Sequence, residues 1–200
     1  MTHGYKVIGN PKSRAMRVLW VLEELGLDYD FSPDPPHSDA VRALNPEGKV
    51  PVFLMDGEPF TDSVAIIQYL ADTHGSLTFP AGTRERLRQD GFTQFAVEEV
   101  DGALWTRSKH AFVYPPEKRL AEIKPLAIWE FDRAMKTLER RLGDREFVMG
   151  DRFTIPDIIL GHCGGWAVPA GFNLPDGPVG DYLARVRSRP ALRRAMKRAV

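Results

Sequence analysis

The 200-residue chain contains a single cysteine, Cys163, so it cannot form an internal disulfide bond. Because disulfides persist in oxidising compartments, one cysteine fits a protein kept in a reducing environment. No apolar run in the chain reaches the roughly 18 residues that a membrane-spanning helix needs, and the N-terminus lacks the apolar region of a signal peptide. We therefore expect a soluble, cytoplasmic protein without a membrane partner.

The chain also lacks net charge, since 27 basic residues balance 27 acidic ones. A neutral chain offers no extended positive surface for nucleic acid. Basic residues do crowd the segment 185–198, but Leu183, Val186 and Leu192 place apolar positions among them. That pattern predicts a solvated helix face, and no nucleic-acid partner is expected.

Several catalytic signatures are missing as well. The chain has no P-loop, no Gly-x-Gly-x-x-Gly fingerprint and no Gly-x-Ser-x-Gly elbow, which argues against nucleotide chemistry and against a serine hydrolase. His110, His162 and Cys163 do not have the spacing of metal ligands. We therefore expect no metal cofactor.

The pattern of apolar residues divides the chain into two parts. Short strands are predicted at 7–8, 29–31, 52–54 and 59–61, with helices over 13–27 and 63–73. After a linker at 77–83 that contains a proline and a glycine, the strand signals vanish. Helices are predicted over 84–111, over 117–142 with a bend at Pro125, and over 154–168, followed by two short ones. The sequence thus predicts an α/β domain at 1–78 and an all-helical domain at 84–200.

The most informative stretch is the segment 45–54, in which Val50-Pro51 leads into an apolar strand. Proline at the first position of a strand has no N–H to donate, and an X–Pro bond is where a cis peptide costs least. A cis bond here would leave the N–H and C=O of Val50 free to pair with an extended peptide.

Two further signals follow this stretch. Asp56-Gly57 predicts a tight hairpin turn, and Asp62-Ser63 stands where a helix begins. Backbone amides at a helix start attract carboxylates. Together, these parts predict a site for a small, extended, acidic peptide.

This arrangement resembles the thioredoxin-like glutathione-binding domain of the cytosolic glutathione S-transferases. The segment 13–27 resembles the first helix of that family, and 147–158 resembles its helix-capping motif, so that the resemblance covers nearly the whole chain. It implies an α/β thioredoxin-like N-terminal domain, an all-α C-terminal domain, glutathione as co-substrate and a homodimer.

The resemblance also implies roles in holding glutathione. The backbone of Val50 would pair with the cysteinyl part while Pro51 holds the cis bend. At the γ-glutamyl end, Asp62 would face the ammonium and Ser63 the carboxylate, although a capping pair without a ligand would look the same. Lys49 would reach the glycyl carboxylate or remain a solvated lysine.

A free thiol with a pKa near 8.5 is mostly protonated at neutral pH, so the enzyme must favour the thiolate. Many family members place Tyr, Ser or Cys directly after the first strand, whereas this chain has Asn10 there. Ser13 follows at the helix start and is either a second candidate donor or a plain N-cap. Lys12 and Arg14 would add positive charge or lie in solvent.

For the electrophile we expect an apolar site that includes Trp105 and Tyr114, since relatives line their substrate pocket with this helix. The alternative is that these rings belong to an aromatic core. By contrast, Thr154 and Asp157 form a capping box, which is a folding element rather than a catalytic one.

The function we expect is that of a glutathione transferase, which conjugates or reduces small apolar electrophiles with the glutathione thiolate. Peroxidase or dehalogenase side activities would use the same site. The alternative, prompted by the unusual Asn10, is a non-catalytic glutathione-transferase-like binding or interaction protein.

Overall fold

The computed structural model describes residues 4–198, and its contacts divide the chain into two compact units. The first unit comprises the chain up to Thr78 together with the segment from Ser188 onward, and the second runs from Phe79 to Arg187. No helix in the described part of the chain is long and apolar enough to cross a membrane.

The first unit contains a four-stranded sheet in the order β2-β1-β3-β4. Its strands are β1 (Tyr5–Ile8), β2 (Asp30–Ser32), β3 (Val52–Met55) and β4 (Glu58–Thr61). β1 runs parallel to β2 and antiparallel to β3, which forms a hairpin with β4. Pro59 lies in the edge strand β4, where a residue without an N–H is tolerated.

Four helices complete this unit: α1 (Ala15–Leu25), α2 (Asp39–Arg42), α3 (Ser63–Thr73) and α9 (Pro190–Arg198). Ile8 and Val52 pair across β1 and β3 and pack with Val41 of α2 in one buried cluster. α1 ends at Gly26, whose φ of 66° is the left-handed conformation that glycine adopts without steric cost.

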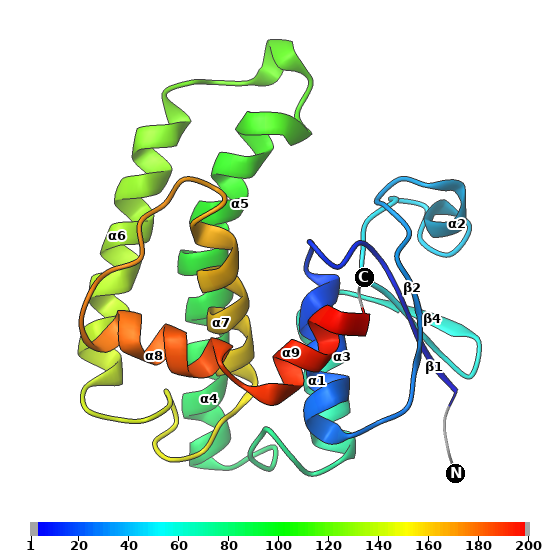
Figure 1. Cartoon of the computed structure of the whole chain (residues 1–200), viewed down its shortest axis with the longest axis horizontal. Coiled ribbons are helices and arrows are strands. Elements are labelled where there is room, and N and C mark those ends of the chain that lie inside the picture. The colour runs from blue at the N-terminus through cyan, green and yellow to red at the C-terminus, as the bar shows by residue number, and fades with distance from the viewer. Residues whose placement is uncertain (1–3, 199–200) are drawn as a thin grey trace. The chain divides into compact units, whose positions relative to one another are not determined.

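The helix α9 packs against α1 within the first unit, as Figure 1 shows, whereas the sequence-based division placed it in the helical domain. Nor are the basic residues at 189–198 simply solvated. Arg189 Nε lies 2.6 Å from Glu24 Oε1, and Arg194 Nε lies 2.8 Å from Glu23 Oε2. The two glutamates are largely buried by these contacts. Because the partners are separated by about 170 positions, local pattern could not reveal them.

The second unit is helical, with α4 (Arg84–Phe95), α5 (Gly102–Ser108), α6 (Ile123–Leu142), α7 (Ile155–Ala167) and α8 (Pro178–Arg187). π-helical turns at Ala96–Asp101 and Lys109–Val113 continue α4 and α5, so the predicted helix over 84–111 is present with two widened stretches.

The prediction for 117–142 is wrong at its start. A short 3₁₀ turn at Pro116–Lys118 precedes α6, which begins only at Ile123. Pro125 therefore lies in the first turn of α6, where its missing N–H costs no intrahelical hydrogen bond.

The predicted capping box at the start of α7 is confirmed. The Asp157 carboxylate is fully buried and accepts four hydrogen bonds, from the N–H of Val148, the hydroxyl of Tyr182, and the N–H and hydroxyl of Thr154, at 2.8–3.0 Å. These bonds tie the loop before α7 and the helix α8 to one acid.

Candidate functional site

The Val50–Pro51 peptide is cis, as the sequence predicts, and it directly precedes β3. The N–H and C=O of Val50 have no hydrogen-bond partner among residues 4–198. The loop before it is held by Asn45, whose Nδ2 donates to the carbonyl of Lys49 at 3.0 Å. The backbone at Val50 thus has one donor and one acceptor available to an extended ligand.

Gly9 brings the end of β1 close to this loop, although sequence reasoning did not single it out. A Cβ at position 9 would lie 2.9 Å from Cβ of Val50 and 3.1 Å from Cβ of Ala15, and the φ of Gly9 is 150°. A larger residue would force the loop or the start of α1 to shift. The glycine therefore lets three segments meet: the end of β1, the loop at Val50 and the start of α1.

Asn10 and Ser13 follow Gly9 in the turn before α1, and their hydrogen bonds differ. The hydroxyl of Ser13 donates to the carbonyl of Asn10 and accepts from the N–H of Ala15 at 3.2 Å. Backbone groups therefore use it both as a donor and as an acceptor. Asn10 Oδ1 accepts from the N–H of Lys12 at 2.8 Å, which fixes the orientation of the amide. Its Nδ2 has no acceptor in the described chain.

Asp62 caps α3 from an unusual backbone conformation, with φ of 68° and ψ of 117°. Its Oδ1 accepts from the N–H groups of Val64 at 2.8 Å and Ala65 at 3.0 Å. Its Oδ2 has no hydrogen bond within the residues that the structure describes. A non-glycine residue in such a region costs about 1–3 kcal/mol, and strain of this kind clusters at functional sites.

Ser63 is the first residue of α3 and is buried. Its Oγ lies 3.5 Å from Nη1 of Arg17, an arginine of α1 that is only 1% exposed. Sequence reasoning missed Arg17. The signal was present, because this arginine stands among the apolar residues of the predicted helix face, where a cation requires partners.

Lys49 stands apart from this group. Its Nζ forms an ion pair with Glu47 Oε2 at 2.7 Å, and its side chain is 74% exposed. The geometry therefore fits the solvated alternative.

The aromatic residues predicted for the electrophile lie in the second unit. Trp105 pairs with Trp166, with ring centroids 6.5 Å apart, and Tyr114 packs edge-to-face on His110 at 5.1 Å. Both are partly exposed. They thus belong to two different aromatic pairs of the helical unit.

No three potential ligands among the histidines, cysteines and acids of residues 4–198 gather into a group that could hold a metal. Cys163 is buried in α7.

Comparison with known proteins identifies the family. Residues 8–78 match the model of the glutathione S-transferase N-terminal domain, and residues 121–198 match that of the C-terminal domain. The chain therefore belongs to the cytosolic glutathione S-transferase family.

Individual relatives agree with this assignment. A protein of Zea mays named Glutathione transferase GST 23 is 28% identical over 169 residues, which cover 82% of this chain and 72% of the relative. A glutathione transferase structure from Methylococcus capsulatus has a TM-score of 0.84 at 28% identity and 98% coverage of both chains. A sphingomonad glutathione S-transferase solved with glutathione has a TM-score of 0.80 at 27% identity, covering 97% of this chain and 98% of the other.

Proposed function

We propose that this chain is a glutathione transferase whose glutathione site is built from the loop at Val50 and the start of α3. The single observation that carries the proposal is the unpaired backbone of Val50 beside the end of β1, within a family of glutathione transferases. Glutathione would lie extended, with its cysteinyl N–H and C=O paired to Val50.

The γ-glutamyl end would lie at α3. Oδ2 of Asp62 would accept from the ammonium, because Oδ1 is already used by the cap. The positive end of the helix dipole would attract the carboxylate, together with the hydroxyl of Ser63. Arg17 would orient that hydroxyl, because its Nη1 donates to Oγ of Ser63.

Asn10 is the better candidate for activating the thiol. A hydrogen bond to a thiolate favours the ionised form and lowers the thiol pKa. The Nδ2 of Asn10 can donate such a hydrogen bond, because it has no acceptor in the described chain. The hydroxyl of Ser13 would first have to break its hydrogen bond to the carbonyl of Asn10. The N-terminus of α1 would add to the effect.

In the reaction, the ionised sulfur attacks an electrophilic carbon and a carbon–sulfur bond forms. The displaced group leaves with its bonding electrons in a substitution, or a proton from solvent completes an addition. Catalysis then consists mainly of positioning and of control over the thiol pKa. We further propose that Trp105 and Tyr114 contact the apolar electrophile.

We also propose a cytoplasmic homodimer. The first unit has an apolar groove of about 200 Å³ on β3, β4 and α3, lined by residues that include Phe53, Phe60 and Tyr69. A second copy would cover this groove. Sedimentation of a single 22.5 kDa species would contradict the dimer.

The test combines glutathione titration with turnover of an activated aryl halide such as chlorodinitrobenzene. We expect Asn10→Ala to lower kcat/KM about 100-fold, because one donor to the developing charge is lost. Asn10→Ser, which keeps a donor, should recover part of the rate. Ser13→Ala should leave kcat/KM nearly unchanged and lower the free energy of unfolding by about 1 kcal/mol, as for a lost cap.

Two results would reject the proposal in different ways. Glutathione binding without turnover of any electrophile would support the non-catalytic binding protein. A chain that does not bind glutathione would exclude the glutathione transferase.

A further inference from the structure

The connection between α5 and α6 projects from the helical unit beyond the end of α7, as Figure 1 shows. We call residues 109–129 the α5–α6 tip: they comprise the π-helical turn after α5, the 3₁₀ turn and the first two turns of α6. In the described chain, five of the nine large apolar side chains that are exposed to solvent lie in this tip, with exposed fractions of 42–65%. They are Phe112, Val113, Leu120, Leu126 and Trp129. Exposed apolar residues that gather in this way mark a surface that binds a partner.

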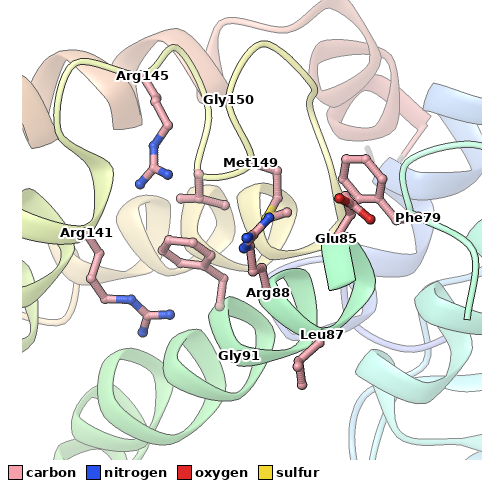
Figure 2. Close-up of a pocket in the computed structure, with 11 residues that line it drawn as sticks. Phe79, Glu85, Leu87, Arg88, Gly91, Arg141, Arg145, Met149 and Gly150 are labelled. Carbon is pink, nitrogen blue, oxygen red and sulfur yellow. The ribbon is translucent and has the colours of Figure 1, made fainter. Parts of the chain in front are cut away.

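Two other exposed apolar residues line hollows elsewhere. Tyr69 lines the groove on β3, β4 and α3 that we assign to a second copy. Leu87 lines a cavity between α4 and the loop at 145–150, whose wall Figure 2 shows. Because α4 and α5 form one nearly continuous helix with a rise of about 1.5 Å per residue, Leu87 and Phe112 lie roughly 35 Å apart. The tip shares no residue with either hollow.

Hydrogen bonds within the tip hold its shape. The guanidinium of Arg119 donates to the carbonyl of Tyr114 at 2.7 Å and to that of Phe112 at 3.2 Å. The N–H of Leu120 donates to Nδ1 of His110 at 3.1 Å, and the His110 ring packs edge-to-face on Tyr114. The exposed side chains of Phe112 and Leu120 thus project from an ordered backbone. Little conformational entropy would be lost when they bind a partner.

The tip is basic, although the whole chain is neutral. Residues 109–129 contain three lysines and one arginine against two glutamates. The side chains of Lys109, Lys118 and Lys124 form neither a hydrogen bond nor an ion pair with any residue that the structure describes. Cations without a protein partner, beside exposed apolar side chains, are complementary to a surface that is anionic outside and apolar beneath.

An anionic lipid bilayer has this chemistry. Its phosphate headgroups attract lysines, and aromatic side chains enter the boundary between headgroups and acyl chains. The long stem of a lysine lets the ammonium remain among the phosphates while apolar neighbours lie deeper. Pairing of two tips with each other is disfavoured, because a symmetric contact would place lysines opposite lysines.

From these observations we propose that the α5–α6 tip docks on the surface of an anionic lipid bilayer. Phe112, Leu120 and Trp129 would enter the headgroup boundary, and the three lysines would pair with lipid phosphates. The expectation of no membrane partner came from the net charge of the whole chain, which does not describe the uneven charge of this segment. The docking is peripheral and uses no residue of the proposed glutathione site.

The test is sedimentation of the full chain with vesicles of phosphatidylglycerol and phosphatidylcholine, compared with vesicles of phosphatidylcholine alone. The wild type should bind the anionic vesicles about tenfold more tightly, and high salt should weaken this preference. The double variant Lys118→Glu with Lys124→Glu should abolish it. Lys136→Glu, which makes the same change at an exposed lysine farther along α6, is the matched control and should bind as the wild type does.

A second variant tests the apolar contact. Phe112→Ser combined with Leu120→Ser should weaken binding to the anionic vesicles about tenfold, because less apolar surface enters the bilayer. Its melting temperature should stay close to that of the wild type, since both side chains are exposed. Leu87→Ser, at the exposed leucine of α4, is the matched control and should leave vesicle binding unchanged.

Equal binding to both kinds of vesicle, or binding to neither, would overturn the proposal, as would unchanged binding by both tip variants. Tip-dependent binding of poly-glutamate without vesicle binding would also overturn it, because the partner would then be an acidic protein. If Phe112→Ser with Leu120→Ser converted a dimer to 22.5 kDa monomers, the tip would be a subunit contact and the proposal would be wrong.

Discussion

Two helices of this protein have an acid at or near their first residue that accepts hydrogen bonds from backbone amides, and the two acids differ in whether an oxygen is left without a hydrogen bond. Asp157, in the first turn of α7, is fully buried, and four donors saturate its two oxygens. Asp62, directly before α3, is exposed and has a positive φ of 68°. Among the described residues, only its Oδ1 accepts hydrogen bonds. The same local device therefore has two uses: a saturated acid holds the fold, and an acid with a free oxygen can hold a ligand.

The surroundings explain the difference. Burial raises the pKa of Asp157, and the hydrogen bonds from Val148, Tyr182 and Thr154 oppose that effect by stabilising the carboxylate. An acid in such a place is costly unless each oxygen is satisfied. Asp62 is exposed, so solvent can satisfy its second oxygen, which we propose accepts from the ammonium of glutathione.

The largest effect is expected for Asp157→Ala. Four donors would lose their acceptor, so we expect the free energy of unfolding to fall by about 3 kcal/mol or more. Urea denaturation measures this change. The matched control is Asp181→Ala, at an exposed acid in the first turn of α8, which should leave stability unchanged. An unchanged melting temperature for Asp157→Ala would contradict the structural role.

Asp62→Asn should give the opposite result. Asparagine keeps an oxygen for the cap and tolerates positive φ, so stability should hold, whereas loss of the charge should weaken glutathione binding about tenfold. Asp56→Asn is the matched control, since Asp56 also has positive φ but lies in the hairpin turn. If both variants bound glutathione equally well, Asp62 would be a cap and nothing more.

Tyr182→Phe should remove one hydrogen bond to Asp157 and lower stability by about 1 kcal/mol near neutral pH. It should also alter the response to alkali. Burial raises the pKa of Tyr182 well above its ordinary value, and Asp157 raises it further, whereas Arg185 lowers it.

The sign of the pH effect follows from that shift. Since the folded pKa lies above the unfolded value of about 10, the stabilising contribution is complete below pH 10 and is lost as the pH rises above it. Denaturation between about pH 9 and 11 should therefore show a smaller loss of stability in Tyr182→Phe than in the wild type. Part of the loss should remain, because burial and Glu23 also raise the pKa of Tyr29. Identical slopes would count against the buried network.

The smallest effect is expected for Asp62→Gly. The variant loses the side-chain cap but relieves the positive φ, so the free energy of unfolding should change by less than about 0.5 kcal/mol. Thermal melting would show this. A large destabilisation would mean that the cap at Asp62 is as important to the fold as that at Asp157.

Features that depend on a few neighbouring residues could be predicted from the sequence. The structure confirms four such predictions: the cis bond at Val50–Pro51, the hairpin of β3 and β4, the start of α3 at Ser63 and the capping box of α7. Each follows from local backbone chemistry.

Features that depend on distant residues could not be predicted. The ion pairs of Arg189 and Arg194 with the glutamates of α1 join residues 165 and 171 positions apart, and the contact between Arg17 and Ser63 joins two helices. The preference for Asn10 over Ser13 also required the structure, because residue type alone did not show which donor the backbone already occupies.

The most direct test of the central claim, a glutathione site that ionises the thiol, is the near-ultraviolet difference spectrum of the protein with glutathione, titrated against pH. The account predicts a thiolate band with an apparent pKa well below the value of about 8.5 for a free thiol, and a return toward that value in Asn10→Ala. Binding of glutathione with no thiolate band at neutral pH would contradict it.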